Sequence, residues 1–170
     1  GELLKTIEGH TGDVWSAEFS PDGSMIVTAS DDRTVKLWNA NTGEILKSLE
    51  GHTLSVRSAQ FSPDGSKIVT ASADQTIRLW NSNTGELLKA FKYWAGIDSA
   101  TFSPDGSKIV VALDDVAEVR DATNDKSLII LDGHTNVVWS AVFSQDGAKI
   151  LTASRDGTVK VWEQDPVKVN

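Results

Sequence analysis

Phe19-Ser20-Pro21-Asp22-Gly23 decides the fold, because this stretch returns along the chain at a nearly fixed period. The same five residue types begin again at Phe61 and Phe102, and Phe-Ser-Gln-Asp-Gly begins at Phe143, so the steps are 42, 41 and 41 residues. A period of this size is typical of repeat architectures, in which one unit cannot bury its own apolar face and stacks on its neighbours. We therefore expect a single domain over residues 1–170, built of four stacked units.

Each period contains four short segments that have the pattern of β-strands. Residues 14–19 alternate in character and lead into Ser-Pro-Asp-Gly, a turn whose second position Pro favours. Residues 25–30 are mostly apolar and β-branched, residues 34–38 alternate again, and residues 44–49 supply a fourth strand. The 3.6-residue spacing that a helical solenoid would need is missing. The sequence predicts an all-β fold, a β-propeller of four-stranded antiparallel blades with four blades in the chain.

Composition and charge argue against several classes of protein. Sixteen basic and twenty-four acidic side chains give a net charge of −8, which opposes the phosphate neutralisation that drives nucleic-acid binding. No apolar run approaches the roughly 20 residues of a membrane span, and residues 1–10 lack the apolar centre of a secretory signal. There is no cysteine. We expect no nucleic-acid partner, no membrane association and a cytoplasmic location.

Three of the four repeats carry a further set of markers. Gly9-His10, Asp32 and Trp38-Asn39 recur as Gly51-His52, Asp74, Trp80-Asn81 and as Gly133-His134, Asp156, Trp162-Glu163. These sets resemble the Gly-His, Asp and Trp-Asp markers of the WD-repeat β-propeller family, and the resemblance covers almost the whole chain. It implies a disc of radially packed sheets that serves as a platform for other macromolecules, without catalysis.

The resemblance also implies a hydrogen-bonded tetrad in each intact repeat, which ties the loop before a blade to the blade itself. The implied sets are His10, Thr28, Asp32, Trp38; His52, Thr70, Asp74, Trp80; and His134, Thr152, Asp156, Trp162. In the first set the sequence leaves open whether Thr28 or Ser30 supplies the hydroxyl, because both lie on one face of the strand.

A His, an Asp and a hydroxyl are also the residue types of a catalytic triad. We favour the structural role, because three copies of one active site would be unusual and the motif's spacing already gives these residues a structural task. No enzyme activity, catalytic residue or cofactor is expected. No metal site is expected either, since the histidines lie 42 and 82 residues apart and none has a second ligand at chelating spacing.

The third repeat, about residues 92–132, departs from the pattern. Tyr93-Trp94 replaces Gly-His, Val111 takes the hydroxyl position and Arg120 takes the Trp position. Exchanging a whole polar set for other groups avoids leaving one buried donor unpaired. This blade is either a drifted blade that still packs or an altered rim that shapes a binding site; Asp115 remains and could pair with Arg120.

The two ends of the chain predict how a ring would close. Residues 2–8 match residues 44–50, the fourth strand of a blade, so we expect sixteen strands with residues 1–8 as the closing strand of a final blade. The resemblance implies rings of seven or eight blades, and two chains would supply eight. We favour a homodimer in which the first strand of each chain completes the last blade of the other. A four-bladed monomer and a fragment of a larger propeller are the alternatives.

In the family, partners bind the narrow face that carries the start of each first strand and the turn between the second and third strands. The matching residues here are Asp13, Trp15, Asp31, Ser55, Arg57, Asp98, Trp139 and Arg155. Trp and Arg dominate the energetics of protein interfaces, so Trp15, Arg57, Trp139 and Arg155 are the expected contacts with a protein or peptide. The alternative is that the two Trp pack between blades and that the chain is a self-assembling module, natural or engineered, with no ligand.

Overall fold

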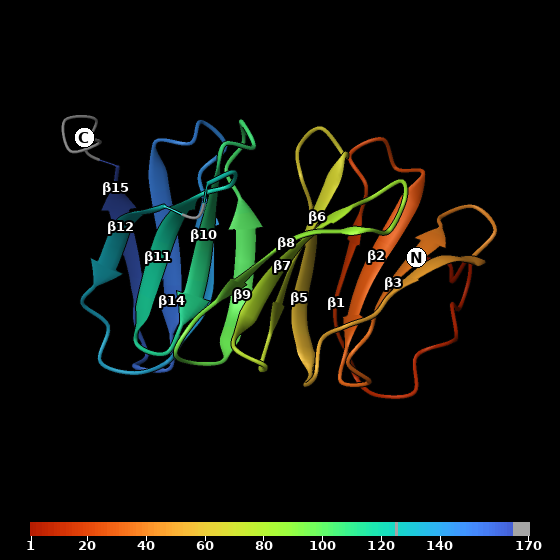
Figure 1. Ribbon diagram of the computed structural model, residues 1–170, viewed down its shortest axis with the longest axis horizontal. Helices are drawn as coiled ribbons and strands as arrows, with labels where there is room; N and C mark the ends of the chain where they lie inside the picture. Colours follow the sequence, from red (N-terminus) through yellow and green to blue (C-terminus); the bar gives the residue numbers. More distant parts are fainter. Residues whose placement is uncertain (125, 165–170) are drawn as a thin grey trace.

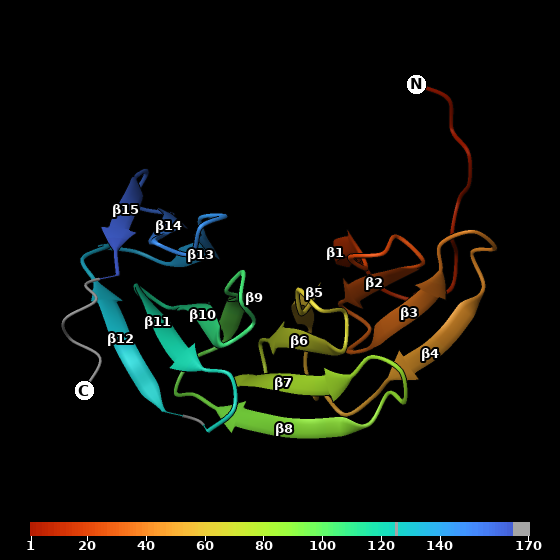
Figure 2. The same ribbon diagram turned by 90° about the horizontal axis from the view of Figure 1, so that it is seen from above.

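The computed structural model describes residues 1–124 and 126–164, and the regular elements in these ranges are fifteen β-strands. The strands form four antiparallel sheets, which we call blades 1 to 4 in chain order. Figures 1 and 2 show the blades side by side along an arc, with the first strand of each blade on the inner side and the last on the outer side. The predicted all-β fold of antiparallel sheets is confirmed.

The strands follow the chain outward within each blade. Blade 1 holds β1 (Val14–Phe19), β2 (Met25–Ser30), β3 (Val35–Asn39) and β4 (Ile45–Leu49). Blade 2 holds β5 (Val56–Phe61), β6 (Lys67–Ser72), β7 (Thr76–Asn81) and β8 (Leu87–Lys92). Blade 3 holds β9 (Ile97–Phe102), β10 (Lys108–Leu113), β11 (Val116–Asp121) and β12 (Ser127–Asp132). Blade 4 holds β13 (Val138–Phe143), β14 (Lys149–Ser154) and β15 (Val159–Glu163), so in the described residues it has three strands.

The repeated Ser-Pro-Asp-Gly stretch forms the turn between the first two strands of a blade. In blade 1 the Gly23 amide donates to the Ser20 carbonyl at 2.8 Å, and the Ser20 hydroxyl donates to the Asp22 carboxylate at 2.6 Å. Gly23 has a φ of 72°, which glycine adopts without steric cost. Ser20, Asp22 and Gly23 therefore determine the turn, which explains why this stretch returns in every repeat.

The turn carboxylates predict a loss of stability in acid. Hydrogen bonds from the turn serines hold the pKa of Asp22, Asp64 and Asp105 at about 2, below the value of about 3.9 for an unfolded chain. The unfolded state then binds protons first, so stability present above about pH 4 is lost as the pH falls toward about 2. We expect the melting temperature to drop over that window. A triple Asp22→Asn, Asp64→Asn, Asp105→Asn variant should show a flatter profile, and an unchanged slope would contradict the assignment.

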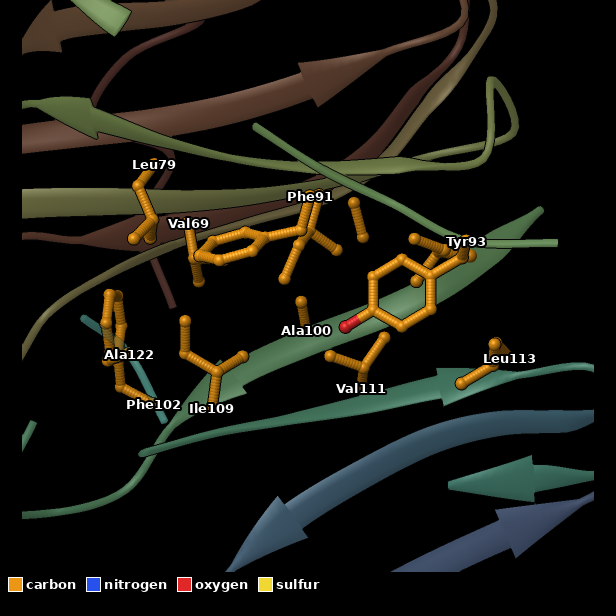
Figure 3. Close-up of a cluster of buried hydrophobic side chains, with 13 residues drawn as sticks. Val69, Leu79, Phe91, Tyr93, Ala100, Phe102, Ile109, Val111, Leu113 and Ala122 are labelled. Atoms are coloured by element: carbon orange, nitrogen blue, oxygen red, sulfur yellow. The ribbon is translucent and has the colours of Figure 1, made fainter. Parts of the chain in front are cut away.

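The hydrophobic core lies between the blades. Three clusters of buried side chains join blade 1 to blade 2, blade 2 to blade 3 and blade 3 to blade 4. Figure 3 shows the middle cluster, where Phe91 of blade 2 and the neighbouring Tyr93 lie against Ile109 and Val111 of blade 3. Each blade thus buries its apolar faces against its neighbours, as a repeat architecture requires.

In the part of the chain that the structure describes, the segment before β1 pairs with no strand. Residues 1–13 form no strand, whereas the sequence predicts a strand over residues 2–8. Figure 2 places the N-terminus at the opposite end of the arc from β15, the edge that this strand would have to pair with. The closing strand stays a prediction that concerns a second chain.

Candidate functional site

Every inner strand carries a β-bulge near its start. In β1 the pairing with β2 shifts between Val14 and Ser16, so Trp15 has no partner opposite it. The residues skipped at the equivalent places in β5, β9 and β13 are Arg57, Asp98 and Trp139. A bulge re-aims a side chain out of the regular alternation of a strand. The four blades therefore each direct one bulged residue toward the same region.

These four side chains line one pocket of about 450 Å³, together with Asp31 and Ser55. All six belong to the predicted binding face. Trp15 and Trp139 are 56% and 50% exposed, so within one chain about half of each residue is open to solvent. A smaller pocket of about 290 Å³ continues from Arg57, Asp98 and Trp139 toward blade 4. The inner mouth of the arc thus offers a hollow with two accessible indole rings.

The two other predicted face residues lie outside the larger pocket. The side chains of Asp13 and Arg155 are exposed. Their backbones hold the neighbouring loops, since the Asp31 amide donates to the Asp13 carbonyl at 2.9 Å and the Arg155 amide donates to the Val137 carbonyl at 2.8 Å. The geometry therefore separates the predicted face into a pocket and two outlying charged residues.

An ion pair between two residues that line the pocket joins blades 2 and 3. The Arg57 Nη1 lies 2.5 Å from the Asp98 Oδ1, and the Arg57 side chain keeps 39% exposure while that of Asp98 keeps 9%. Burial raises the pKa of Asp98, and the charge of Arg57 partly offsets this. The guanidinium is thus anchored at one end and still open to a ligand, which suits a hydrogen-bond donor for a peptide carbonyl or carboxylate.

Trp15 is also held in place. Its Nε1 donates to the Asp31 carboxylate at 2.9 Å. Hydrogen bonding with Ser55 and Trp15 lowers the pKa of Asp31, so this carboxylate is charged at neutral pH. A ring fixed by such a bond loses little conformational freedom when a partner packs on it.

The tetrad residues of blades 1, 2 and 4 lie together. In blade 2, His52 Nδ1 is 2.8 Å from the Asp74 carboxylate and His52 Nε2 is 2.7 Å from the Thr70 hydroxyl, to which the Trp80 Nε1 donates at 3.0 Å. The matching distances are 2.7, 2.7 and 2.8 Å in the set of His10, Thr28, Asp32, Trp38. They are 2.7, 2.8 and 2.9 Å in the set of His134, Thr152, Asp156, Trp162.

The threonine hydroxyls are the acceptors for the indoles, whereas Ser30 accepts from the Asp32 amide at 3.1 Å. Burial lowers the pKa of His52, and the link to Asp74 partly counters this. Burial raises the pKa of Asp32, but hydrogen bonds from Thr34, His10 and Thr11 outweigh it and hold that pKa well below its usual range. Each hydroxyl is already engaged by two partners, so the arrangement fits a structural link better than a free nucleophile.

Blade 3 replaces the tetrad with a different buried set. Val111 is fully buried where the other blades have a tetrad threonine. The Arg120 Nη2 donates to the Glu118 carboxylate at 3.2 Å, and its guanidinium lies 4.9 Å from the centre of the Tyr93 ring. Among the described residues, the ion pair of Arg120 is with Glu118 and not with Asp115, the partner that the sequence suggested.

Two other kinds of site are missing from the ranges that the structure describes. No group of three or more His, Cys, Asp or Glu side chains there is placed to hold a metal ion. No helix in the same ranges has the length and apolar character needed to cross a membrane.

Comparisons with known proteins agree with the repeat pattern. The family described as "WD domain, G-beta repeat" matches residues 1–39, 43–81 and 125–163. The "Eukaryotic translation initiation factor 3 subunit I" of Aspergillus niger is 46% identical over 43 residues, which is 25% of this chain and 13% of that protein. The "Probable cytosolic iron-sulfur protein assembly protein Ciao1" of Anopheles gambiae is 45% identical over 38 residues, 22% of this chain and 11% of that protein. The matched part is a small fraction of both relatives.

Proposed function

The chain belongs to the WD domain, G-beta repeat family, and from that premise we propose that it is a non-catalytic scaffold that binds a protein or peptide. The binding face carries Trp15, Arg57, Trp139 and Arg155, with Asp13, Asp31, Ser55 and Asp98 around them. The observation that carries this proposal is the inner pocket, because four bulges bring two half-exposed indoles and an anchored guanidinium to one place. Such residues are the ones that dominate protein interfaces.

The proposal includes the role of the tetrads, the location and the assembly state. The tetrads hold the loops that border the pocket, and the protein acts in the cytoplasm without a cofactor or metal. The working unit is a homodimeric ring of eight blades. In the described residues blade 4 has three strands and every other blade has four, so the outer edge of β15 can take a strand from a second copy. The same observation favours a second candidate function, a self-assembling module that takes no ligand.

Removing the pocket's indoles should abolish recognition and leave the fold intact. We expect peptides selected from a random phage-displayed library on the immobilised protein to lose about 30-fold or more in affinity for Trp139→Ala and for Trp15→Ala, a cost of about 2 kcal/mol each. Melting temperatures should change little, because each ring is about half exposed. Titration calorimetry of the purified variants measures both affinities.

Trp94→Ala is the matched control, since Trp94 is 65% exposed and does not line the pocket. Its peptide affinities should match those of the unmodified protein. If selected peptides bind all three variants equally, the pocket is not the binding site. If no peptide is selected at all, the ligand-free module becomes the better account.

A further inference from the structure

The two ends of the arc present apolar faces that other blades bury. Phe19 of blade 1 is 63% exposed, whereas Phe61 at the same place in blade 2 is 4% exposed. Val161 of blade 4 is 65% exposed, whereas Leu37 at the same place in blade 1 is fully buried. Figure 2 shows both end blades facing the open side of the arc. Each free face thus lacks a neighbour that its counterparts have.

The two free faces are the two halves of one interface. Between blades 1 and 2, Val35, Leu37 and Leu49 of blade 1 pack with Val56 and Phe61 of blade 2 in a single cluster. At the ends of the arc, Val159 and Val161 of blade 4 are the counterparts of Val35 and Leu37. Val14 and Phe19 of blade 1 are the counterparts of Val56 and Phe61, and all four of these end residues are exposed. Three interfaces of this kind form within the chain. The two halves of a fourth lie apart, one at each end of the arc.

The N-terminal segment already lies beside blade 1 as an outer strand of a preceding blade would. The space next to Gly43 is occupied by the side chains of Lys5 and Ile7. The space next to Gly85, the same position in blade 2, is occupied by Lys47 and Leu49 of β4. Residues 5–7 therefore hold the position relative to blade 1 that β4 holds relative to blade 2.

A second contact repeats the same relation. The Lys5 ammonium donates to the Asn41 carbonyl in the β3–β4 turn. The Lys89 ammonium of β8 donates to the Thr123 carbonyl, the equivalent turn position in blade 3, at 3.0 Å. The segment thus lies where the outer strand of a preceding blade would lie, although the described residues place no inner strands of such a blade beside it.

We propose that blade 4 of a second copy of this chain fills the slot between the N-terminal segment and the free face of blade 1. Residues 2–8 then become the fourth strand of that blade, and Ile7 takes the place that Leu49 has in blade 1. If the two copies are related by a two-fold rotation about the axis of the ring, both pairs of free faces meet at once. Two copies then close a ring. This inference rests on the proposed homodimer and specifies how it is made.

The register of the exchanged strand follows from β3 and β4. Lys36 pairs with Ser48 in that ladder, and the equivalent pair across the two copies is Lys160 with Thr6. Because Lys36 and Ser48 are both at least partly exposed and side by side, with Nζ 3.4 Å from Oγ, cysteines introduced at positions 160 and 6 should be close and open to oxidation in the ring.

The chain contains no cysteine, so a Thr6→Cys, Lys160→Cys double variant tests this register directly. Under mild oxidation we expect most of the protein to run on a non-reducing gel as a covalent pair of twice 18.3 kDa. A Thr6→Cys, Lys36→Cys variant is the matched control, because Lys36 is already paired with Ser48 of its own blade. It should stay at the mass of one chain.

Three results would overturn the proposal. One is a double variant that stays reduced, and another is an internal disulfide without a gain in mass. The third is a ladder of higher multiples, which would mean that the copies form an open series instead of a closed pair.

Association should also depend on the apolar side chain that the segment contributes. Ile7→Asp is expected to raise the dimer dissociation constant about 10-fold or more, since an Ile buried in the ring becomes a charge. Leu4→Asp should have little effect, because its counterpart Leu46 stays 46% exposed on the outer side of its blade. Equal effects of the two changes in sedimentation velocity would contradict the exchange.

These results separate the ring from the binding function. If the Thr6→Cys, Lys160→Cys variant dimerises without forming the disulfide, strand exchange is wrong but the ring still stands. A chain that remains single would reject the ring and leave peptide binding by the pocket to be measured independently.

Discussion

Phe61→Ala is expected to lower the free energy of unfolding by about 3–5 kcal/mol, the usual cost of truncating a buried Phe. Phe61 is 4% exposed and packs in the cluster that joins blades 1 and 2. The cavity would lie at the interface between two blades, where each blade depends on its neighbour for burial. Urea unfolding followed by tryptophan fluorescence measures the change.

Phe19→Ala is the informative comparison, because Phe19 has the same place in blade 1 but is exposed within one chain. If a second copy covers it, the loss of stability appears at protein concentrations at which the chains associate and fades on dilution. Phe61→Ala should be costly at every concentration. If the two variants lose equal free energies of unfolding in dilute solution, Phe19 is buried within a single chain. That result would contradict the open arc.

His52→Ala should lower the free energy of unfolding by about 1–3 kcal/mol, because it leaves buried polar groups unpaired. His52 is buried and connects the Asp74 carboxylate to the Thr70 hydroxyl, which also receives the Trp80 indole. The loss comes less from the bond itself than from the desolvated partners that remain.

A double-mutant cycle with Asp74→Ala isolates this effect. Once one partner is gone, removing the other should cost less, so the two losses should not add. Additive losses would mean that the two residues act separately. If His52→Ala left the unfolding curve unchanged but removed a hydrolytic activity, the structural role of the tetrads would be wrong.

The regular part of the fold could be predicted because each blade repeats the same local signals. The Ser-Pro-Asp-Gly turn depends on hydrogen bonds between near neighbours such as Ser20 and Asp22. The alternation in residues 25–30 and 34–38 likewise reflects burial on one side of a short strand. The residues that make these interactions are close to one another in the sequence, so the sequence pattern predicts the turns and strands.

The bulges are not part of the sequence prediction, although a signal for them exists. Val14, Ala17 and Phe19 are spaced by three and then two residues, and the extra residue is the bulge that re-aims Trp15. The prediction treats the segment as a regular alternation. A break in the period of two is the sequence sign of a bulge, and here it marks the residues of the candidate pocket.

Interactions between blades could not be read from the sequence. Arg57 and Asp98 are 41 residues apart and meet because neighbouring blades stack in one register. The Arg120 guanidinium lies 5.9 Å from the centre of the Phe91 ring of blade 2, a contact that also depends on the stacking. Its ion-pair partner Glu118, in contrast, is a near neighbour on the same strand. The position of Lys5 beside Gly43 likewise follows from the stacking, since the segment occupies the place of another blade's strand.

The molar mass of the unmodified 170-residue chain in dilute solution tests the central claim most directly. The account predicts twice 18.3 kDa by light scattering coupled to size-exclusion chromatography, because the described residues of one chain leave two matching blade faces and one strand edge uncovered. A single species of 18.3 kDa across the concentration range would contradict it. The exposed faces of blades 1 and 4 would then have to be stable in water without a second copy.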